Sequence, residues 1–402
     1  MALNKQVLHE LDAQLDDVAR ERLSVAVDRI VEAKERGGKV AVVTGSGPNV
    51  HEGVTTLISE LMRVGVVDGV TTSSAVVAHE MGGVLDKVKR VNGRTLGVDP
   101  RLLPKGGTFE LTMMSEDLLA EVAEDLTLDF ELMERIRQTP GDTIIKAAGN
   151  LGYPMGLYLE QLSAQILDVA RGRGISFEEA AGAGADTRTM IGRGAEMGLP
   201  VLVTIPQLIG GGAVGLAIGD SLSIRERAKR IAAMMGSADV IIESAVALTQ
   251  EIHDGPFEIH TGHGLWAAWL GDDVYSLEGK SLIRMDLDPA LEKAWQAERK
   301  GSAVQEAIDK GLPKTKLFKI PFRMEMSGFA RLESSVALTG DIGSLWPLLA
   351  QRVAERLGVT LEFMSYPQQT PAGQAMREWI VDEIKPVVRR RVFEAHAWNV
   401  AR

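Results

Sequence analysis

A short glycine-containing loop at residues 45–53 (GSGPNVHEG) has the composition of a phosphate-binding turn. It follows a β-branched run and opens a helical pattern, and backbone N–H groups at the start of a helix can hold a phosphate. Glycines let a phosphate come close, so Gly45, Ser46 and Gly47 are candidate cofactor contacts. The loop departs from the full G-x-G-x-x-G fingerprint, and no acidic residue closes the next predicted strand. A plain tight turn is therefore an equal alternative.

A second loop, at residues 206–215 (PQLIGGGAVG), carries the run Gly210, Gly211 and Gly212. Three successive glycines inside a folded domain cost backbone entropy. We therefore favour close approach of a ligand, here the substrate, over a tight turn at this position.

Three histidines and an aspartate form a cluster within residues 253–263 (HDGPFEIHTGH). Neutral imidazoles and a carboxylate are suitable ligands for zinc, nickel or iron, which makes His253, His260 and His263 candidate metal ligands. Their spacing matches no zinc motif, and a glycine-rich loop does not hold ligands on one helix face. We favour solvated or core histidines here, with a metal site and an acid–base role as the alternatives.

Two further histidines follow predicted strands and are better placed for proton transfer. His51 lies in the 45–53 loop, and His79 with its neighbour Glu80 lies shortly after the strand that ends near residue 72. Side chains at such positions can act as general acid or base when they reach a substrate. Each histidine could equally be an ordinary helix-surface residue.

The strands that must position these residues are predicted by short β-branched runs that end in turns. They lie at residues 39–44, 66–72, 199–205, 238–242 and 336–339. Helical patterns separate several of them, and strand–helix–strand order implies a parallel sheet with right-handed crossovers. We predict an α/β fold with a doubly wound parallel sheet.

Helical segments complete the predicted organisation. Residues 3–36 carry apolar positions at helical spacing, which predicts an N-terminal helical extension at 1–38. We expect one α/β domain at 39–402, in which roughly 109–185 is mostly helical and the charged segment 284–319 is a helical surface insertion. Ligands of such sheets bind at the carboxyl ends of the strands, near a switch in strand order. That rule selects the loops at 45–53, 71–76, 206–215 and 340–344.

Composition and charge exclude several kinds of site and partner. The chain has 402 residues, no cysteine, and a net charge of -11 from 44 basic and 55 acidic residues. The absence of cysteine excludes disulfides, thiolate metal sites and a thiol nucleophile. The acidic balance argues against binding to nucleic acid or to anionic membranes, since both would repel it. With no signal-peptide core and no stretch of about 20 apolar residues, we expect a cytoplasmic protein.

Three segments, in the same order along the chain, resemble those of deoxyhypusine synthases. They are residues 53–72 (GVTTLISELMRVGVVDGVTT), 198–215 (GLPVLVTIPQLIGGGAVG) and 336–349 (VALTGDIGSLWPLL). The resemblance implies a parallel-sheet fold of the NAD-binding type and a homotetramer with sites between subunits. It also implies that NAD oxidises spermidine and that the aminobutyl group, held on a lysine as an imine, passes to a lysine of a translation initiation factor. Carried over residue by residue, it suggests cofactor contacts at Asn49, Thr71, Thr72, Ser73, Gly340 and Asp341.

The chain departs from this family where the family's chemistry needs particular residues. Phe329 stands where the family has its catalytic lysine, and Lys280 could replace that lysine only from a different part of the chain. The loop after Pro206 lacks the acid that would meet a polyamine, and an unpaired buried charge is costly. We therefore expect a divergent relative rather than a true deoxyhypusine synthase.

Our leading hypothesis is NAD-linked oxidation or group transfer on a small amine or amino acid. His51, His79 or Glu80 would act as acid or base, and Lys280 or Arg331 would hold an anionic substrate. The alternatives are a metal-dependent enzyme that uses the histidine cluster and a non-catalytic oligomeric ligand-binding protein. The expected partners are a small-molecule substrate and other copies of the chain, in a tetramer by the family resemblance.

Overall fold

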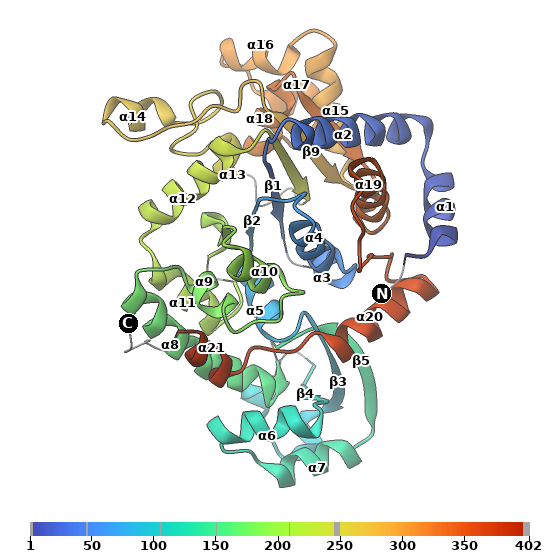
Figure 1. The fold of residues 1–402 in the computed structure, drawn as a ribbon, viewed down its shortest axis with the longest axis vertical. Coiled ribbons are helices and arrows are strands. Elements are labelled where there is room, and N and C mark those ends of the chain that lie inside the picture. The colour runs from blue at the N-terminus through green and yellow to red at the C-terminus, as the bar shows by residue number, and fades with distance from the viewer. Residues whose placement is uncertain are drawn as a thin grey trace.

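The computed structural model describes residues 3–45, 47–104, 106–149, 151–208, 210–244 and 250–396, without the side chains of residues 250, 324 and 325. Within these ranges, a six-stranded sheet forms the centre of the molecule and a four-stranded sheet forms a second lobe (Figure 1). No helix in the described ranges combines the length and apolar character needed to cross a membrane.

The central sheet has the strand order β10-β9-β8-β1-β2-β7, and all neighbouring strands are parallel. Its strands are β1 (Val40–Thr44), β2 (Gly69–Thr72), β7 (Val201–Val203), β8 (Val240–Ser244), β9 (Ser281–Asp286) and β10 (Ser335–Thr339). From β1 the chain adds β2 and β7 on one side, and then returns to β8 on the other side. The switch in strand order therefore lies between β1 and β8. The predicted α/β fold with a parallel sheet is confirmed.

Strand β9 is the central-sheet strand that the sequence patterns did not reveal. Its sequence SLIRMD contains Arg284 and Asp286, so it lacks the continuous apolar run of the other strands. Nevertheless β9 pairs with both β8 and β10, and Arg284 is fully buried there. The charged segment predicted as an insertion from residue 284 therefore begins inside this strand.

The hydrophobic core has two layers, one on each face of the central sheet. Alternation along β1 sends Val40 and Val42 into one layer and Ala41 and Val43 into the other. The first layer is covered by α2 (Asp17–Glu35), α4 (Val54–Arg63), α5 (Ser74–Met81), α8 (Met155–Arg173), α9 (Phe177–Gly182), α10 (Met190–Met197), α11 (Ala213–Ser221) and α19 (Ile342–Leu357). The second layer is covered by α12 (Ile224–Ser237), α13 (Gln250–His253), α15 (Pro289–Arg299) and α18 (Met324–Arg331).

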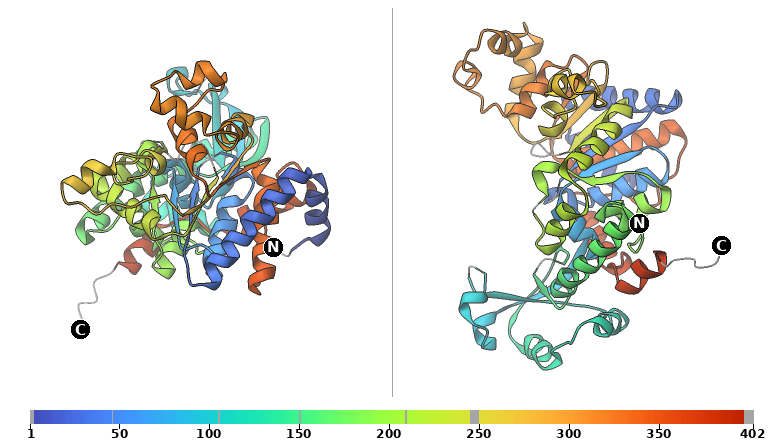
Figure 2. Two further views of the ribbon diagram at one scale, coloured as in Figure 1. Left: turned by 90° about the horizontal axis from the view of Figure 1, so that it is seen from above. Right: turned by 90° about the vertical axis from the view of Figure 1, so that its left-hand side faces the viewer.

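The second lobe is inserted between α5 and α8. Its sheet has the order β5-β3-β4-β6. Helices cover more than half of residues 109–185, as predicted, but the prediction missed the strands that this range contributes to the sheet. The lobe contains β3 (Leu85–Asn92), β4 (Thr108–Thr112), α6 (Glu116–Asp125), α7 (Phe130–Gln138), β5 (Gly141–Ala147) and β6 (Gly152–Tyr153). Figures 1 and 2 show it projecting from the end of the molecule that faces the loops after β1 and β2.

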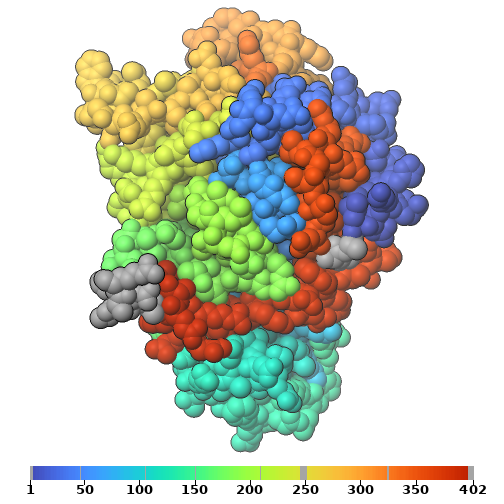
Figure 3. Space-filling view, viewed as in Figure 1, coloured from blue at the N-terminus to red at the C-terminus, as the bar shows by residue number. Residues whose placement is uncertain are grey.

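The remaining helices lie around this framework. The N-terminal α1 (Lys5–Gln14) and α2 pack on α19, and α2 also contacts β10. Above the central sheet in Figure 1 lie α14 (Gly264–Trp269), α16 (Ala303–Asp309) and α17 (Lys314–Phe318). The C-terminal segment, with α20 (Pro371–Glu383) and α21 (Arg389–Ala395), runs across the molecule between the central body and the second lobe (Figure 3).

Candidate active site

Three side chains join the elements that meet at the switch point between β1 and β8. Asn49, in the short helix α3 (Pro48–His51) after β1, donates from Nδ2 to the carbonyl oxygen of Ser244 at 2.9 Å. The Ser244 hydroxyl donates to Oδ1 of Asn49 at 2.8 Å and accepts from Nε1 of Trp346 in α19 at 2.8 Å. All three residues are buried. Asn49, a predicted cofactor contact, therefore fixes the loop after β1 to its neighbours.

Four threonine hydroxyls lie at the carboxyl ends of three neighbouring strands. Thr44 ends β1, Thr71 and Thr72 end β2, and Thr204 follows β7. All four residues are fully buried, and their hydroxyl oxygens have no hydrogen-bond partner within the described ranges. Because buried polar groups are normally paired, this edge has hydrogen-bonding capacity that a ligand could use. The neighbouring Ser73 instead caps α5, where its hydroxyl accepts from the N–H of Val76 at 3.2 Å.

The glycine loop after β1 requires glycine for its backbone. Gly47 has φ 69° and ψ −117°, a conformation that other residues rarely adopt, and a Cβ there would meet no atom within 4 Å. The space beside Gly47 is therefore open. Gly45 is buried at the end of β1, and Ser46 lies outside the described residues.

The turn after β10 approaches the same loop. Gly340 leads into Asp341, which caps α19 by accepting from the N–H of Gly343 at 3.2 Å. A Cβ at Gly343 would lie 2.7 Å from Oε2 of Glu52, which accepts from the N–H of Gln368 at 2.6 Å. Burial raises the pKa of Glu52 against the hydrogen bonds from Gln368, and the charge of Asp341 raises it further. The loops after β1 and β10 therefore meet at Glu52 and Gly343.

The run Gly210, Gly211 and Gly212 packs against other parts of the chain. A Cβ at Gly211 would lie 3.0 Å from the carbonyl oxygen of Ser74, at the start of α5. After Gly212, the first N–H group of α11 donates to both carboxylate oxygens of Glu160 at 3.1 Å. Close packing of the chain on itself thus accounts for the glycines that we had assigned to substrate approach.

His51 and His79 lie at the junction between the two sheets. His79 is buried in α5, and its Nδ1 lies 2.9 Å from the carbonyl oxygen of Ala148, just after β5. His51 is half-buried at the end of α3, which contacts β5. Burial lowers the pKa of His51, and the positive charges of Arg377 and Lys146 and the coupling to the His79 imidazole lower it further. Burial also lowers the pKa of His79, so its imidazole is uncharged at neutral pH. At neutral pH the His51 imidazole is therefore uncharged and able to accept a proton.

The same junction contains charged residues that the sequence analysis missed. Lys146 of β5 donates from Nζ to Glu110 of β4 at 2.7 Å, and it is the cross-strand partner of Asp86 in β3. Burial raises the pKa of Asp86 to about 6. Arg377 of α20 donates to the carbonyl oxygen of Ile145 at 2.6 Å. The alternation of polar and apolar residues at 108–112 was the signal that could have revealed strand β4 and its inward-facing carboxylate.

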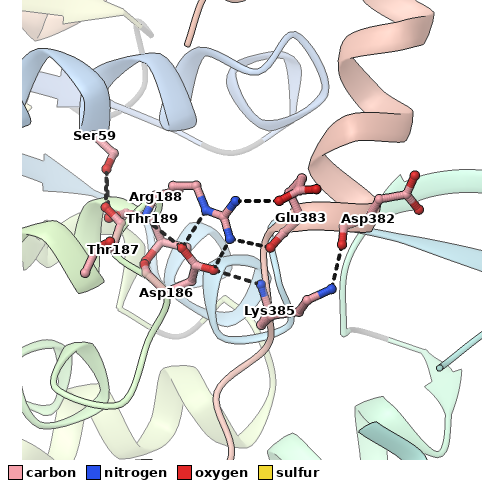
Figure 4. A network of polar contacts seen from close by, with 8 residues as sticks. All are labelled: Ser59, Asp186, Thr187, Arg188, Thr189, Asp382, Glu383 and Lys385. Atoms are coloured by element: carbon pink, nitrogen blue, oxygen red, sulfur yellow. Dashed lines mark hydrogen bonds and ion pairs between the residues drawn. The ribbon is translucent and has the colours of Figure 1, made fainter. Parts of the chain in front are cut away.

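Helix α20, which carries Arg377, is held at its C-terminal end by a polar network (Figure 4). Arg188 bonds Asp186 at 2.8 Å and Glu383 of α20 at 3.1 Å. The hydroxyl of Ser59, in α4, donates to two carbonyl oxygens of the loop that contains Arg188. The network links α20 to the body of the molecule, so that Arg377 is presented to the junction from a fixed helix.

Glu80 holds the start of another helix. It is fully buried, and its two oxygens accept the N–H groups of Met190 and Ile191 at 2.9 and 3.0 Å, at the start of α10. Burial raises its pKa to about 7 against these hydrogen bonds. The carboxyl group of Glu80 is therefore engaged at the start of α10, even though Glu80 is next to His79 in the sequence.

Lys280 and Arg331 lie away from the junction. Lys280 precedes β9, at the amino edge of the sheet, and donates to the carbonyl oxygens of Gly236 and Ala238 at 2.8 and 2.6 Å. Burial lowers its pKa. Arg331 ends α18 and donates to Oε1 of Gln305 at 3.2 Å. The expectation that these two residues share a site with the loops after β1 and β2 is corrected, because Lys280 precedes a strand and Arg331 belongs to the opposite helical layer.

The histidines of residues 253–263 do not converge. His253 is fully buried and hydrogen-bonded to Glu243, which also accepts from Nε of Arg284 at 2.6 Å. His260 is exposed, and the exposed His263 lies 3.7 Å from Asp254. Among the described residues, no group of three or more histidine, aspartate or glutamate side chains could hold a metal ion. The alternative of a metal-dependent enzyme thus loses its proposed ligand set.

Phe329, which stands at the position of the family's lysine, belongs to the core. It is fully buried in α18, with its ring centre 5.0 Å from Cζ of Arg284 and 6.2 Å from the ring of His253. An aromatic side chain at this position cannot form an imine.

No protein-family model and no curated protein matches the chain. Among solved structures, it is similar to a conserved LOR/SDH-type protein from Methanococcus maripaludis S2, at 10% identity over 86% of this chain and 70% of that chain, with a TM-score of 0.41. It is also similar to ArgZ, an arginine dihydrolase of the cyanobacterial ornithine–ammonia cycle, at 13% identity over 85% of this chain and 32% of that chain, with a TM-score of 0.39. A third is AgrE in ternary complex with ornithine and NAD+, at 13% identity over 88% of this chain and 34% of that chain, with a TM-score of 0.38.

The chain therefore spans about a third of the length of ArgZ and of AgrE. None of these three proteins is a deoxyhypusine synthase. Likenesses of this strength leave the function to be argued from the geometry of the chain itself.

Proposed function

We propose that the chain binds NAD across the switch point between β1 and β8 and uses it on a small amine or amino acid held at the junction of the two sheets. The observation that carries the proposal is the doubly wound strand order. Its carboxyl edge ends in buried hydroxyls that have no partner among the described residues, and it faces the second lobe. Ligands of such sheets bind at this edge. The three segments that resemble deoxyhypusine synthases contribute the same loops, which supports a divergent relationship to that family.

The residues at this edge fit a dinucleotide. Thr44 and Thr72 have buried hydroxyls without a partner in the described ranges, and the backbone beside Gly47 is open to a close contact. These groups would hold the ribose and phosphate parts through neutral hydrogen bonds. The chemistry that NAD supplies is acceptance of a hydride.

The junction supplies the groups that would hold and deprotonate the substrate. Lys146 and Arg377 are two cations that lie near His51, and they could bind the carboxylate of an amino acid. The uncharged imidazole of His51 would take the proton from the substrate amine or hydroxyl. Because Phe329 replaces the family's lysine, we propose direct oxidation without a covalent imine on that position.

A thermal-shift experiment with NAD and NADP tests the cofactor half of the proposal. We expect the wild-type chain to gain about 2.7 kcal/mol of stability at a ligand concentration 100 times the Kd. Gly47→Val should abolish this gain, because valine strains the loop and fills the open space. Gly97→Val is the matched control, since Gly97 also has a positive φ (77°) and open space around it but lies in the second lobe. Absence of any shift with both dinucleotides would overturn the proposal.

Formation of NADH with a panel of amino acids and amines tests the substrate half. We expect His51→Gln and Lys146→Met to keep the thermal shift with NAD. His51→Gln should lose at least about a hundredfold in turnover, the lower end of what a positioned acid or base contributes. Lys146→Met should also lower turnover, because it removes a cation that would hold the substrate. Equal turnover in both variants and wild type would remove the junction from the proposed mechanism.

A further inference from the structure

A cavity of about 370 Å³ lies beside α12, on the side of the central sheet opposite α4 and α19. It is bordered by α12, α13 and the residues that follow β7, and α12 and α13 lie next to each other in Figure 1. Ile224, Ala228 and Ile231 line it from one stripe of α12, with Pro206 and Phe257 among the other lining residues. Its volume falls in the range of about 300–1,000 Å³ that is typical of small-molecule sites.

One carboxyl group stands out among the apolar residues that line this cavity. Oε2 of Glu251 accepts from the N–H of Ile205 at 2.8 Å, whereas Oε1 is buried without a hydrogen-bond partner in the described part of the chain. Burial raises the pKa of Glu251 to about 8, against the hydrogen bond from Ile205 and the charge of Arg227. At neutral pH the carboxyl group is therefore protonated and has one O–H to donate.

The charges around the cavity narrow the class of ligand. No lysine, arginine or histidine is among the described residues that line it, and its other charged residue is Asp254. An anion would meet two acidic side chains without a cation to pair with. A cation would require Glu251 to ionise in apolar surroundings, a cost that the charge of Arg227 offsets only in part, and the same positive charge would repel the cation. An uncharged molecule avoids both costs.

We propose that this cavity is a binding site for an uncharged, mainly apolar molecule whose hydrogen-bond acceptor meets the carboxyl group of Glu251. Such a molecule could be the base of a dinucleotide held along the carboxyl edge, or a separate small molecule. The two sources share the same chemistry, because each offers an apolar body with a neutral acceptor. The site does not depend on catalysis at the junction of the two sheets.

Titration calorimetry of the full chain with acetophenone and ethylbenzene tests the site. The two probes are similar in size, but only acetophenone has a carbonyl acceptor, and a net hydrogen bond of about 1 kcal/mol predicts roughly five- to tenfold tighter binding. Glu251→Gln should keep this preference, because its amide can donate. Glu251→Leu should still bind both probes but lose the preference.

Equal affinity for the two probes in the wild type, or binding of neither, would overturn the site. Tighter binding of benzoate or benzylamine than of acetophenone would overturn the ligand class. Saturating NAD distinguishes the two sources: competition with acetophenone identifies the base of the dinucleotide as the occupant, and independent binding identifies a separate molecule. If NAD does not bind the chain at all, the proposed function fails, but the probe series still tests whether the cavity is a binding site.

Discussion

The junction of the two sheets and the buried group around Glu243 both combine histidine with charged side chains, yet they are built in opposite ways. At Glu243 opposite charges meet, because its carboxylate bonds both His253 and Arg284, and all three residues are fully buried. Burial alone would raise the pKa of Glu243, but Arg284 and His253 outweigh it and hold the pKa below its ordinary value.

At the junction, by contrast, cations gather around a half-buried imidazole. His79, Lys146 and Arg377 all lower the pKa of His51 in addition to burial. Lys146 is paired with Glu110, whereas the buried Nε of the half-buried Arg377 side chain has no partner within the described ranges. The difference suggests a rule for this molecule: a fully buried histidine that is paired with a carboxylate supports the fold, whereas an uncharged histidine beside cations can accept a proton while the cations bind an anion.

Breaking the buried group around Glu243 should have the largest effect on stability. Arg284→Met removes the cation that compensates Glu243 and leaves a buried carboxylate with one partner fewer. We expect a loss of about 3–5 kcal/mol in the free energy of unfolding, as for other buried pairs from which one partner is removed. Chemical denaturation followed by circular dichroism measures this loss.

Arg36→Met is the matched control for that variant. The Arg36 side chain is 62% exposed and pairs with Asp239 at 3.1 Å, so its replacement should cost less than about 1 kcal/mol. A loss at Arg284 no larger than the loss at Arg36 would contradict the structural role assigned to the buried group.

The next largest effect should be the contribution of Glu80 to the pH dependence of the free energy of unfolding. Its pKa is about 7 in the folded chain and 4.5 ordinarily, so the folded state holds the proton over a range where the unfolded state has released it. The resulting stability is complete below about pH 4.5 and is lost as the pH rises through 7, a change of about 3 kcal/mol. Glu80→Gln cannot titrate, so its stability relative to wild type should rise by about this amount between pH 5 and pH 8.

Urea denaturation of both proteins at several pH values checks this. Other buried acids, such as Asp86 and Glu251, titrate in both proteins and cancel in the difference. A pH-independent difference would mean that Glu80 is ionised throughout, and its two hydrogen bonds to α10 would then outweigh burial.

Local sequence patterns predicted five strands of the central sheet but not β9, and the reason is physical. The five strands are mainly continuous apolar or β-branched runs, which burial on both faces of a parallel sheet requires. In β9 the charge of Arg284 interrupts that run, and its compensating partner Glu243 is 41 residues away. A pattern read within one strand cannot detect compensation of this kind.

The candidate site was predictable to a similar extent. His51 was found because loops that follow strands of a parallel sheet gather at one edge. Lys146 and Arg377 were not, because one belongs to a strand in a region predicted as mostly helical and the other to α20, more than 300 residues beyond His51 in the sequence. Their approach to His51 depends on tertiary packing of the second lobe and of the C-terminal segment, which no local spacing encodes.

The smallest expected effect is a change in the pKa of His51 at the junction. Because burial, the cations Arg377 and Lys146 and the imidazole of His79 lower the pKa of His51, its imidazole should titrate below the ordinary value of 6.5 in NMR spectra of the full chain. Lys146→Met removes one of these cations, and Glu110 keeps its other partner, Arg90, at 3.0 Å. The midpoint for His51 should therefore rise toward the ordinary value.

Lys87→Met serves as the control for charge removal on the same sheet. Lys87 pairs with Glu378 at 3.5 Å and is not among the charges that act on His51, so its replacement should leave the His51 midpoint unchanged. If Lys146→Met also leaves the midpoint unchanged, Lys146 does not contribute to the field at His51, and the anion-binding role proposed for the junction would rest on Arg377 alone. An upward shift in the Lys146 variant only would show that a cation of the second lobe tunes a histidine of the central sheet, and the two lobes would then form one electrostatic unit.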